Sequence, residues 1–258
     1  MPREQTHAKW RYGIRMQAQD AEQAAEISVL VPALNEEDSI RQVIERVLAI
    51  PMKVEVIVID DGSSDKTAEI MRSFADKIVC IHNEKRQGKG AAIVRGLAKA
   101  TGRVVIIQDA DLEYLPEEIP SVVGPILAGK ESVVYGTRFA HGMPKSMALP
   151  NKLVNILLAW AVRLLYFRRM TDEATCYKAF RLDVIQGMDL QCKRFEFCPE
   201  ATAKAIRMGN HILEVPISYT ARTTMEGKKI RWTDAPHAFL TLARYRFWRK
   251  NGSKPSSG

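Results

Sequence analysis

The chain has 258 residues, of which 46% are hydrophobic and 26% charged, a composition that excludes a disordered chain and supports an ordinary apolar core. Its formal net charge of +8 favours anionic partners such as phosphates, nucleotides or an acidic membrane surface. The four cysteines, Cys80, Cys176, Cys192 and Cys198, lack the spacing of a metal site or a disulfide framework, so we expect free thiols in a cytoplasmic protein.

The first half of the sequence alternates short apolar strands with helices. Residues 1–26 are polar and lack the apolar segment of a signal peptide, so we expect a loosely attached, partly helical extension and no secretory leader. The segments ISVLVPALNEEDSI and VEVIVIDDGSSDKTAEIMRSF each predict a strand, a short loop and a helix. KIVCIHNE predicts a third strand, GKGAAIVRGLAKA a helix, and RVVIIQDAD a fourth strand. This alternation predicts a single α/β domain, in which a mostly parallel, Rossmann-like sheet carries helices on both faces.

The second half is less regular. SVVYGTRF predicts a strand ending at Arg138, FCPEATAKAIRMGN a helix, and HILEVPISYTART a strand whose Pro216 indicates an edge position. The apolar stretch 153–167 is shorter than the roughly 20 residues that span a bilayer, so a buried or interfacial helix is expected there. We assign residues 27–247 to the folded domain and residues 248–258 to a flexible basic tail.

Polar clusters follow the predicted strands: Asn35-Glu36, Asp60-Asp61, residues 86–89 and residues 109–113. Ligands of parallel sheets bind beyond the carboxyl ends of the strands. We therefore expect these clusters to meet at one edge of the sheet.

Three acids lie within five residues behind the fourth strand. In an extended segment alternate residues share a face, so Asp109, Asp111 and Glu113 can hold Mg²⁺ or Mn²⁺ while substrate phosphates complete the shell. A solvated turn or a helix cap is the alternative, because Asp-x-Asp is common by chance.

Other candidates are ambiguous when taken singly. Asp60 or Asp61 can accept a hydrogen bond from a ribose hydroxyl, but a helix cap or a phosphorylated receiver aspartate also begins with such acids. Lys89 and the backbone N–H groups of RQGKGAA can meet an anion at a helix start. Glu200 is either a general base or an acid favoured by the dipole of its own helix. The cations that we place near phosphates are Arg138, Lys152, Arg222 and Lys228, although each one alone is more often a surface residue.

Seven segments together form a specific pattern. In order and spacing, SVLVPALNEEDSI, VIVIDDGSSDKT, GKGAAIVRGL, VVIIQDADLEYLPEEIP, YGTRF, TDEATCYKAFR and EVPISYTARTTMEGKKI resemble family 2 glycosyltransferases of the GT-A fold. The similarity is to the branch of dolichyl-phosphate mannosyltransferases and polyprenyl-phosphate glucosyltransferases, and it covers residues 27–247.

The resemblance implies roles for individual positions. Asp109, Asp111 and Glu113 would hold the metal and the donor diphosphate, and Arg222 and Lys228 would clamp phosphate. Lys152 stands where mannosyltransferase relatives have an arginine, and Glu200 matches a glutamate in the helix before EVPISY. The nucleotide-sugar site would further include Pro32, Leu34, Glu36, Asp61, Ala110 and Arg138.

The implied activity is inverting, metal-dependent transfer of a hexose from a GDP- or UDP-sugar to a polyprenyl phosphate. Asp111, Arg138 and Glu200 would be the catalytic residues, and membrane contact would be peripheral, on the cytoplasmic face. Two alternatives remain: transfer to a hydroxyl acceptor with Glu200 as base, and a non-catalytic basic protein that binds membranes or RNA. No nucleic acid is expected, because aromatic RNA-binding motifs are missing, and a dehydrogenase would need a GxGxxG after the first strand.

Overall fold

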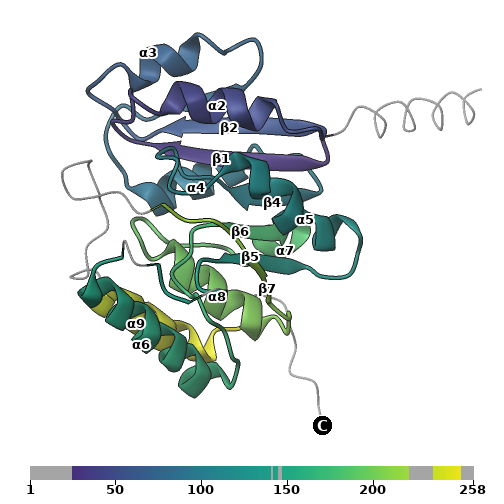
Figure 1. Cartoon of the computed structure of the whole chain (residues 1–258), viewed down its shortest axis with the longest axis vertical. Coiled ribbons are helices and arrows are strands. Elements are labelled where there is room, and N and C mark those ends of the chain that lie inside the picture. The colour runs from purple at the N-terminus through teal and green to yellow at the C-terminus, as the bar shows by residue number, and fades with distance from the viewer. Residues whose placement is uncertain (1–24, 141, 145–146, 221–234, 251–258) are drawn as a thin grey trace, which may run out of the picture.

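A seven-stranded sheet forms the centre of the molecule, in the order β3-β2-β1-β4-β6-β5-β7 (Figure 1). The computed structural model describes residues 25–140, 142–144, 147–220 and 235–250. The strands are β1 (Ile27–Ala33), β2 (Val54–Asp60), β3 (Val79–His82), β4 (Val104–Ile107), β5 (Val133–Thr137), β6 (Lys178–Arg181) and β7 (Leu213–Pro216). The helices are α2 (Ile40–Leu48), α3 (Thr67–Arg72), α4 (Lys89–Leu97), η1 (Pro116–Glu118), α5 (Ile119–Leu127), α6 (Leu149–Tyr166), α7 (Leu182–Gln186), α8 (Phe197–Arg207), α9 (Ala235–Arg244) and η4 (Tyr245–Phe247).

The central strands are covered on both faces. Every residue of β4 and β5 is buried, and β4 (VVII) is accordingly a continuous apolar run rather than an alternating one. Gly96 lets α4 approach the sheet closely, since a Cβ at this position would lie 2.7 Å from Cδ1 of Ile59. The expected α/β domain with a mostly parallel sheet is confirmed.

One strand runs against the others. β6 pairs antiparallel with β4 and with β5, while β1, β2, β3, β4, β5 and β7 are mutually parallel. The register Ile106↔Ala179 places the residues that precede β6 beside those that follow β4. The sequence around 171–177 therefore reaches the same edge of the sheet as Asp109 and Asp111.

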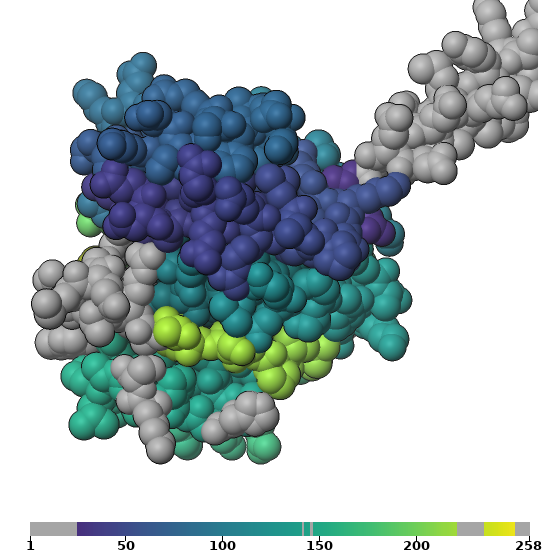
Figure 2. All heavy atoms as spheres, turned by 45° about the horizontal axis from the view of Figure 1, so that its top comes forward, coloured from purple at the N-terminus to yellow at the C-terminus, as the bar shows by residue number. Residues whose placement is uncertain are grey.

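The strand that ends in Pro216 is at the edge, as its proline predicts. β7 pairs only with β5 among the described strands, and its residues are half-buried or exposed. In Figure 2 the yellow-green residues around β7 form an exposed strip across the surface.

Helices α6, α8 and α9 build a second, smaller core beside the sheet. Leu158 and Val162 of α6 pack with Ala203 of α8 and Leu242 of α9, and the hydroxyl of Tyr166 donates to the carbonyl of Leu242 at 2.6 Å. Figure 1 shows α6 and α9 side by side. No helix among the described residues has the length and apolar character needed to cross a membrane.

Candidate active site

A pocket of about 300 Å³ lies at the carboxyl ends of β1, β2 and β4. It brings together most of the residues that the sequence singled out. Those that line it are Pro32, Leu34, Glu36, Asp61, Lys89, Asp109, Ala110, Asp111, Glu113 and Arg138.

The three acids behind β4 lie in a loop that turns after Asp109. β4 ends at Ile107 and a turn begins at Ala110, so the strand alternation expected for these acids is wrong. Leu112 has a left-handed backbone with φ of 58°, which reverses the chain between Asp111 and Glu113. The N–H of Glu113 then donates to Oδ1 of Asp111 at 3.2 Å. The turn, rather than the pleat of a strand, keeps the acids together.

The electrostatics of this turn favour a cation. Burial and the charges of Asp109 and Glu113 raise the pKa of Asp111 to about 7. Glu113 is held in place by the hydroxyl of Tyr219, which donates to Oε2 at 3.1 Å. A divalent ion between these carboxylates would relieve their mutual repulsion.

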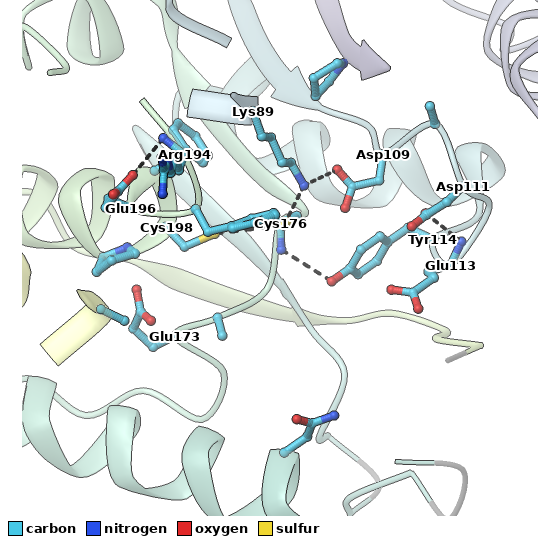
Figure 3. Close-up of a pocket in the computed structure, with 18 of the residues that line it drawn as sticks. Lys89, Asp109, Asp111, Glu113, Tyr114, Glu173, Cys176, Arg194, Glu196 and Cys198 are labelled. Atoms are coloured by element: carbon cyan, nitrogen blue, oxygen red, sulfur yellow. Dashed lines mark hydrogen bonds and ion pairs between the residues drawn. The ribbon is translucent and has the colours of Figure 1, made fainter. Parts of the chain in front are cut away.

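Lys89 supplies a positive charge at the same place. Its Nζ lies 2.5 Å from Oδ1 of Asp109 and 3.1 Å from Sγ of Cys176, as Figure 3 shows. Burial opposes protonation of Lys89, but the charge and hydrogen bond of Asp109 together with the nearby Cys176 and Cys198 outweigh it and raise the pKa of the lysine well above its usual value. Lys89 therefore enters the pocket as an ammonium group bound to the first acid of the Asp-Ala-Asp segment.

The described residues offer no group of three His, Cys, Asp or Glu side chains close enough to hold a metal by themselves. The fit to Mg²⁺ or Mn²⁺ is nevertheless good for a site that the substrate completes. Such ions are commonly held by one or two carboxylates, with phosphate oxygens and water in the remaining positions. Asp111, a buried carboxyl whose pKa is raised by burial and by the charges of Asp109 and Glu113, is the carboxylate best suited to this.

The two acids after β2 differ in their partners. Asp61 lines the pocket and accepts from the N–H groups of Gln87 at 2.8 Å and Gly88 at 2.7 Å, so it fixes the loop that carries Lys89. Asp60 is fully buried, lies outside the pocket lining and accepts from Ser63, while His82 Nδ1 is 2.6 Å from its Oδ2.

The start of α4 does not present the expected backbone donors. The N–H of Gly90 donates to the carbonyl of Arg194 at 2.8 Å, and that of Ala91 to Lys193 at 3.0 Å. The expectation that these N–H groups meet an anion is wrong for this arrangement, because the segment before α8 already uses them. Lys89 remains available through its side chain.

Arg138 is buried in a bidentate ion pair. Its Nε donates to Oδ2 of Asp172 at 2.7 Å and its Nη2 to Oδ1 at 2.6 Å, while Nη2 also reaches Asn155 of α6 at 3.2 Å. The guanidinium lies over the ring of Tyr219, 5.0 Å from its centroid. Asp172 thus holds the charge of Arg138 at the pocket wall.

Glu200 and Lys152 lie outside the lining of this pocket. The carboxylate of Glu200 is 1% exposed, accepts from Nζ of Lys204 at 2.5 Å, and also accepts from the N–H of Gln191 at 2.8 Å. A carboxylate so occupied is poorly placed to take a proton from an acceptor. Arg222, Lys228, residues 1–24 and residues 251–258 lie outside the described residues.

The structure adds pocket residues that the sequence did not single out. Glu173 and Cys176 come from the segment before β6, and Cys198 from α8, with the two sulfur atoms 3.9 Å apart. α6 and α9 contribute Val154, Leu158 and Ala238. The available signal was TDEATCYKAFR, whose acids stand just before a strand and reach the site because that strand is antiparallel.

Most residues of this site, including every one from Pro32 to Cys176, fall in a segment that matches a known family. Residues 28–186 match the model of glycosyl transferase family 2. The chain belongs to this family.

Several relatives extend the match over most of the chain. The undecaprenyl-phosphate 4-deoxy-4-formamido-L-arabinose transferase of Photorhabdus laumondii is 32% identical over 86% of this chain and 66% of its own length. The UDP-N-acetylglucosamine–dolichyl-phosphate N-acetylglucosaminyltransferase of Methanococcus voltae is 30% identical, over 79% of this chain and 90% of its own. The dolichol-phosphate mannosyltransferase of Pyrococcus furiosus is 27% identical, and the match spans 58% of its length. The chain thus covers less than two thirds of the arabinose transferase and the mannosyltransferase.

Solved structures support the fold. Glucosyl-3-phosphoglycerate synthase from Mycobacterium tuberculosis, crystallised with UDP, superposes with a TM-score of 0.69 at 24% identity, over 88% of this chain and 82% of that one. The expected GT-A fold of this family 2 glycosyltransferase is confirmed.

Proposed function

We propose that the chain transfers a hexose from a nucleoside diphosphate sugar to a polyprenyl phosphate, with Mg²⁺ or Mn²⁺ bound at Asp109 and Asp111. The observation that carries this proposal is a single pocket that joins those acids to the apolar helices α6 and α9. One end of the pocket suits a charged diphosphate and the other an isoprenoid chain. The relatives named for undecaprenyl and dolichyl phosphates support the choice of acceptor.

The nucleotide end would be formed by the loops after β1 and β2. Pro32, Leu34, Glu36 and Asp61 line the pocket there, and Ala110 lies between the two metal-binding acids. A Mycobacterium tuberculosis relative was crystallised with Mn²⁺ and UDP, which supports a divalent metal with a diphosphate in this fold. When bound, the metal would neutralise charge on the leaving diphosphate.

The chain's own cations would share that task. Lys89 and Arg138 line the pocket, and Arg222 and Lys228 are proposed to complete the clamp. Stabilising developing negative charge is usually a large contribution to catalysis. An acceptor phosphate is already an anion at neutral pH, so an in-line displacement with inversion needs no strong base, which agrees with the engagement of Glu200 by Lys204.

The acceptor would reach the pocket from a membrane surface. One face of α6 is apolar and exposed, with Leu149 78%, Trp160 61% and Leu164 74% accessible, and Phe167 directly after the helix is 79% accessible. Arg163 is exposed in the last turn of α6, and the exposed Arg168 and Arg169 follow the end of the helix. Exposed apolar side chains with arginines close by are typical of helices that lie in the interface of an anionic bilayer. We place the protein peripherally on the cytoplasmic face of the membrane.

A panel assay tests the proposal. The protein is incubated with GDP-mannose, UDP-glucose or UDP-N-acetylglucosamine, a short polyprenyl phosphate, and Mg²⁺ or Mn²⁺, and the lipid product is detected by mass spectrometry. We expect one donor to give lipid-linked sugar only when metal is present. Full activity in EDTA would contradict the metal assignment.

A further inference from the structure

Glu173 is a buried carboxylate at the wall of the pocket. The residue is 1% exposed and lines the pocket, yet neither Oε1 nor Oε2 has a hydrogen-bond partner of normal geometry among the described residues. Figure 3 shows it across the pocket from Asp109, Asp111 and Glu113, with Cys176 between. An unsatisfied buried polar group costs stability, so its retention calls for a partner.

The adjacent carboxylate shows what a satisfied group looks like here. Asp172 accepts two bonds from the guanidinium of Arg138 and one from its backbone N–H. Lys178 is the cation with the largest effect on the pKa of Glu173. It donates to the backbone carbonyl of Glu173 at 2.8 Å and to Oγ1 of Thr202 at 3.3 Å, and not to the carboxylate. Lys178 thus balances the charge of Glu173 without filling its acceptor positions. Burial raises the pKa of Glu173, and Lys178 and the nearby hydroxyl of Thr202 oppose that rise. That hydroxyl lies 3.1 Å from the hydroxyl of Tyr135 and makes no hydrogen bond of normal geometry with Glu173.

The segment that carries Glu173 is rigidly held. Oε1 of Glu214 accepts from the N–H of Thr171 at 3.0 Å and from that of Asp172 at 2.9 Å. The hydroxyls of Thr171 and Thr137 are 2.7 Å apart. A group fixed in this way is preorganised toward the pocket, as a ligand-binding side chain needs to be.

We propose that Glu173 accepts hydrogen bonds from hydroxyl groups of the transferred sugar and so selects the donor. The assignment rests on the proposed function and names a further residue of that site. A neutral hydrogen-bond donor fits best beside Glu173, because the charge of Glu173 is already balanced by Lys178 and that of Arg138 by Asp172. A phosphate would be repelled by Glu173, which places the acceptor's phosphate elsewhere in the pocket. A site that hydrogen-bonds a substrate hydroxyl discriminates strongly against the analogue lacking it.

Binding measurements without acceptor test this assignment apart from turnover. Calorimetry in Mn²⁺ compares UDP, UDP-glucose and monodeoxyfluoro UDP-glucose analogues, or the corresponding GDP-mannose set, on the wild type, Glu173→Gln and Glu173→Met. We expect Glu173→Met to bind the sugar nucleotide about tenfold or more weakly while affinity for the nucleoside diphosphate stays within about twofold. On the wild type, one deoxyfluoro analogue should bind more weakly than the parent sugar nucleotide. On Glu173→Met, the same analogue and the parent should bind almost equally, because the hydroxyl removed from the sugar and the carboxylate removed from the protein belong to one contact. Glu131→Gln, on a residue paired with His211 outside the pocket, is the matched control.

The outcomes separate the two claims. In one outcome, the wild type binds the sugar nucleotide and makes lipid-linked sugar, and the variants bind every analogue as the wild type does. This outcome overturns the role of Glu173 and leaves the proposed function standing. A wild type that binds no nucleotide sugar contradicts the proposed function and this assignment with it. The analogue series on the wild type needs no variant to fold, and an equal affinity for all analogues would also overturn the assignment.

Discussion

Lys89 and Asp109 form an ion pair inside the pocket, with Nζ 2.5 Å from Oδ1 and both side chains less than one fifth exposed. The pair joins the start of α4 to the turn after β4, and it places an ammonium group where a metal ion would also be favoured. Lys89 and a divalent cation are therefore expected to compete for Asp109 until a diphosphate arrives and can bind both.

Replacing Lys89 separates these two effects. Lys89→Met should bind Mn²⁺ alone about threefold or more tightly, because the competing charge is gone, yet bind UDP or GDP in Mn²⁺ more weakly. Titration of free Mn²⁺ by electron paramagnetic resonance and of nucleotide by calorimetry measures both. Lys99→Met, an exposed lysine at the end of α4, is the control. Tighter nucleotide binding by Lys89→Met would contradict the expected role.

The raised pKa of Asp111 predicts how stability without metal depends on pH. Its carboxyl titrates at about 7 in the folded chain and near 4 when unfolded. Between these values the folded state keeps a proton that the unfolded state has lost, so stability falls as the pH rises through this window. In EDTA, Asp111→Asn should melt at a higher temperature than the wild type at about pH 8, and the difference should shrink as the pH falls and be lost only at about pH 4 or below. The exposed Asp76→Asn is the control, and a difference that does not depend on pH would refute the electrostatic account.

The same carboxyl predicts the pH dependence of metal binding. A metal that binds Asp111 must displace its proton below pH 7, so affinity should rise from about pH 6 to about pH 8 and then level off. Thermal shifts with a fixed Mn²⁺ concentration report this, and Asp111→Asn should abolish the shift. A shift that is retained by Asp111→Asn would move the metal away from this residue.

Glu200 is predicted to act on stability more than on chemistry. Its ion pair with Lys204 is buried on both sides, so Glu200→Gln leaves an uncompensated ammonium and should cost on the order of 3 kcal/mol of unfolding free energy. Lys204 also lies 4.5 Å from the ring centroid of Tyr245 and 5.1 Å from that of Trp248, which ties this pair to the end of α9. The double variant Glu200→Gln, Lys204→Met should recover much of the loss. Turnover per folded molecule toward polyprenyl phosphate should stay within about tenfold, and near-complete loss in a folded variant would restore Glu200 as a base.

The exposed face of α6 is predicted to bind anionic membranes. Trp160→Glu with Leu164→Glu should abolish flotation with phosphatidylglycerol vesicles, since both apolar contacts are replaced by charges that the surface repels. Turnover of a short, water-soluble polyprenyl phosphate should be little changed. Lys99→Gln with Lys130→Gln, at exposed residues outside α6, lowers the net charge by the same two units and serves as the matched charge control. Equal flotation of both double variants would contradict the role of α6.

The sequence predicted the part of the site that depends on parallel strands. Leu34, Asp61 and Asp109 follow strands with clear apolar signatures, and the carboxyl-end rule brings them to one pocket. Glu173 was missed because it precedes a strand, and only the antiparallel pairing of β6 carries it to that edge.

Other differences depend on contacts between distant segments. The N–H groups at the start of α4 read as anion donors, but the carbonyls of Lys193 and Arg194 occupy them. Glu200 reads as a candidate base until its neighbour Lys204, one helical turn later, is seen buried against it. Neither the local sequence pattern nor the residue spacing indicates which partner a buried group contacts in the folded chain.

The most direct test of the central claim is the balance between nucleotide release and lipid product. Wild-type protein is incubated with Mn²⁺, the preferred nucleotide sugar and vesicles that hold either polyprenyl phosphate or the matching polyprenol. With polyprenyl phosphate we expect equal amounts of nucleoside diphosphate and lipid-linked sugar. With the polyprenol we expect no transfer. Asp111→Asn should form neither product. Transfer to the polyprenol, or nucleotide release without any lipid-linked sugar, would contradict the account.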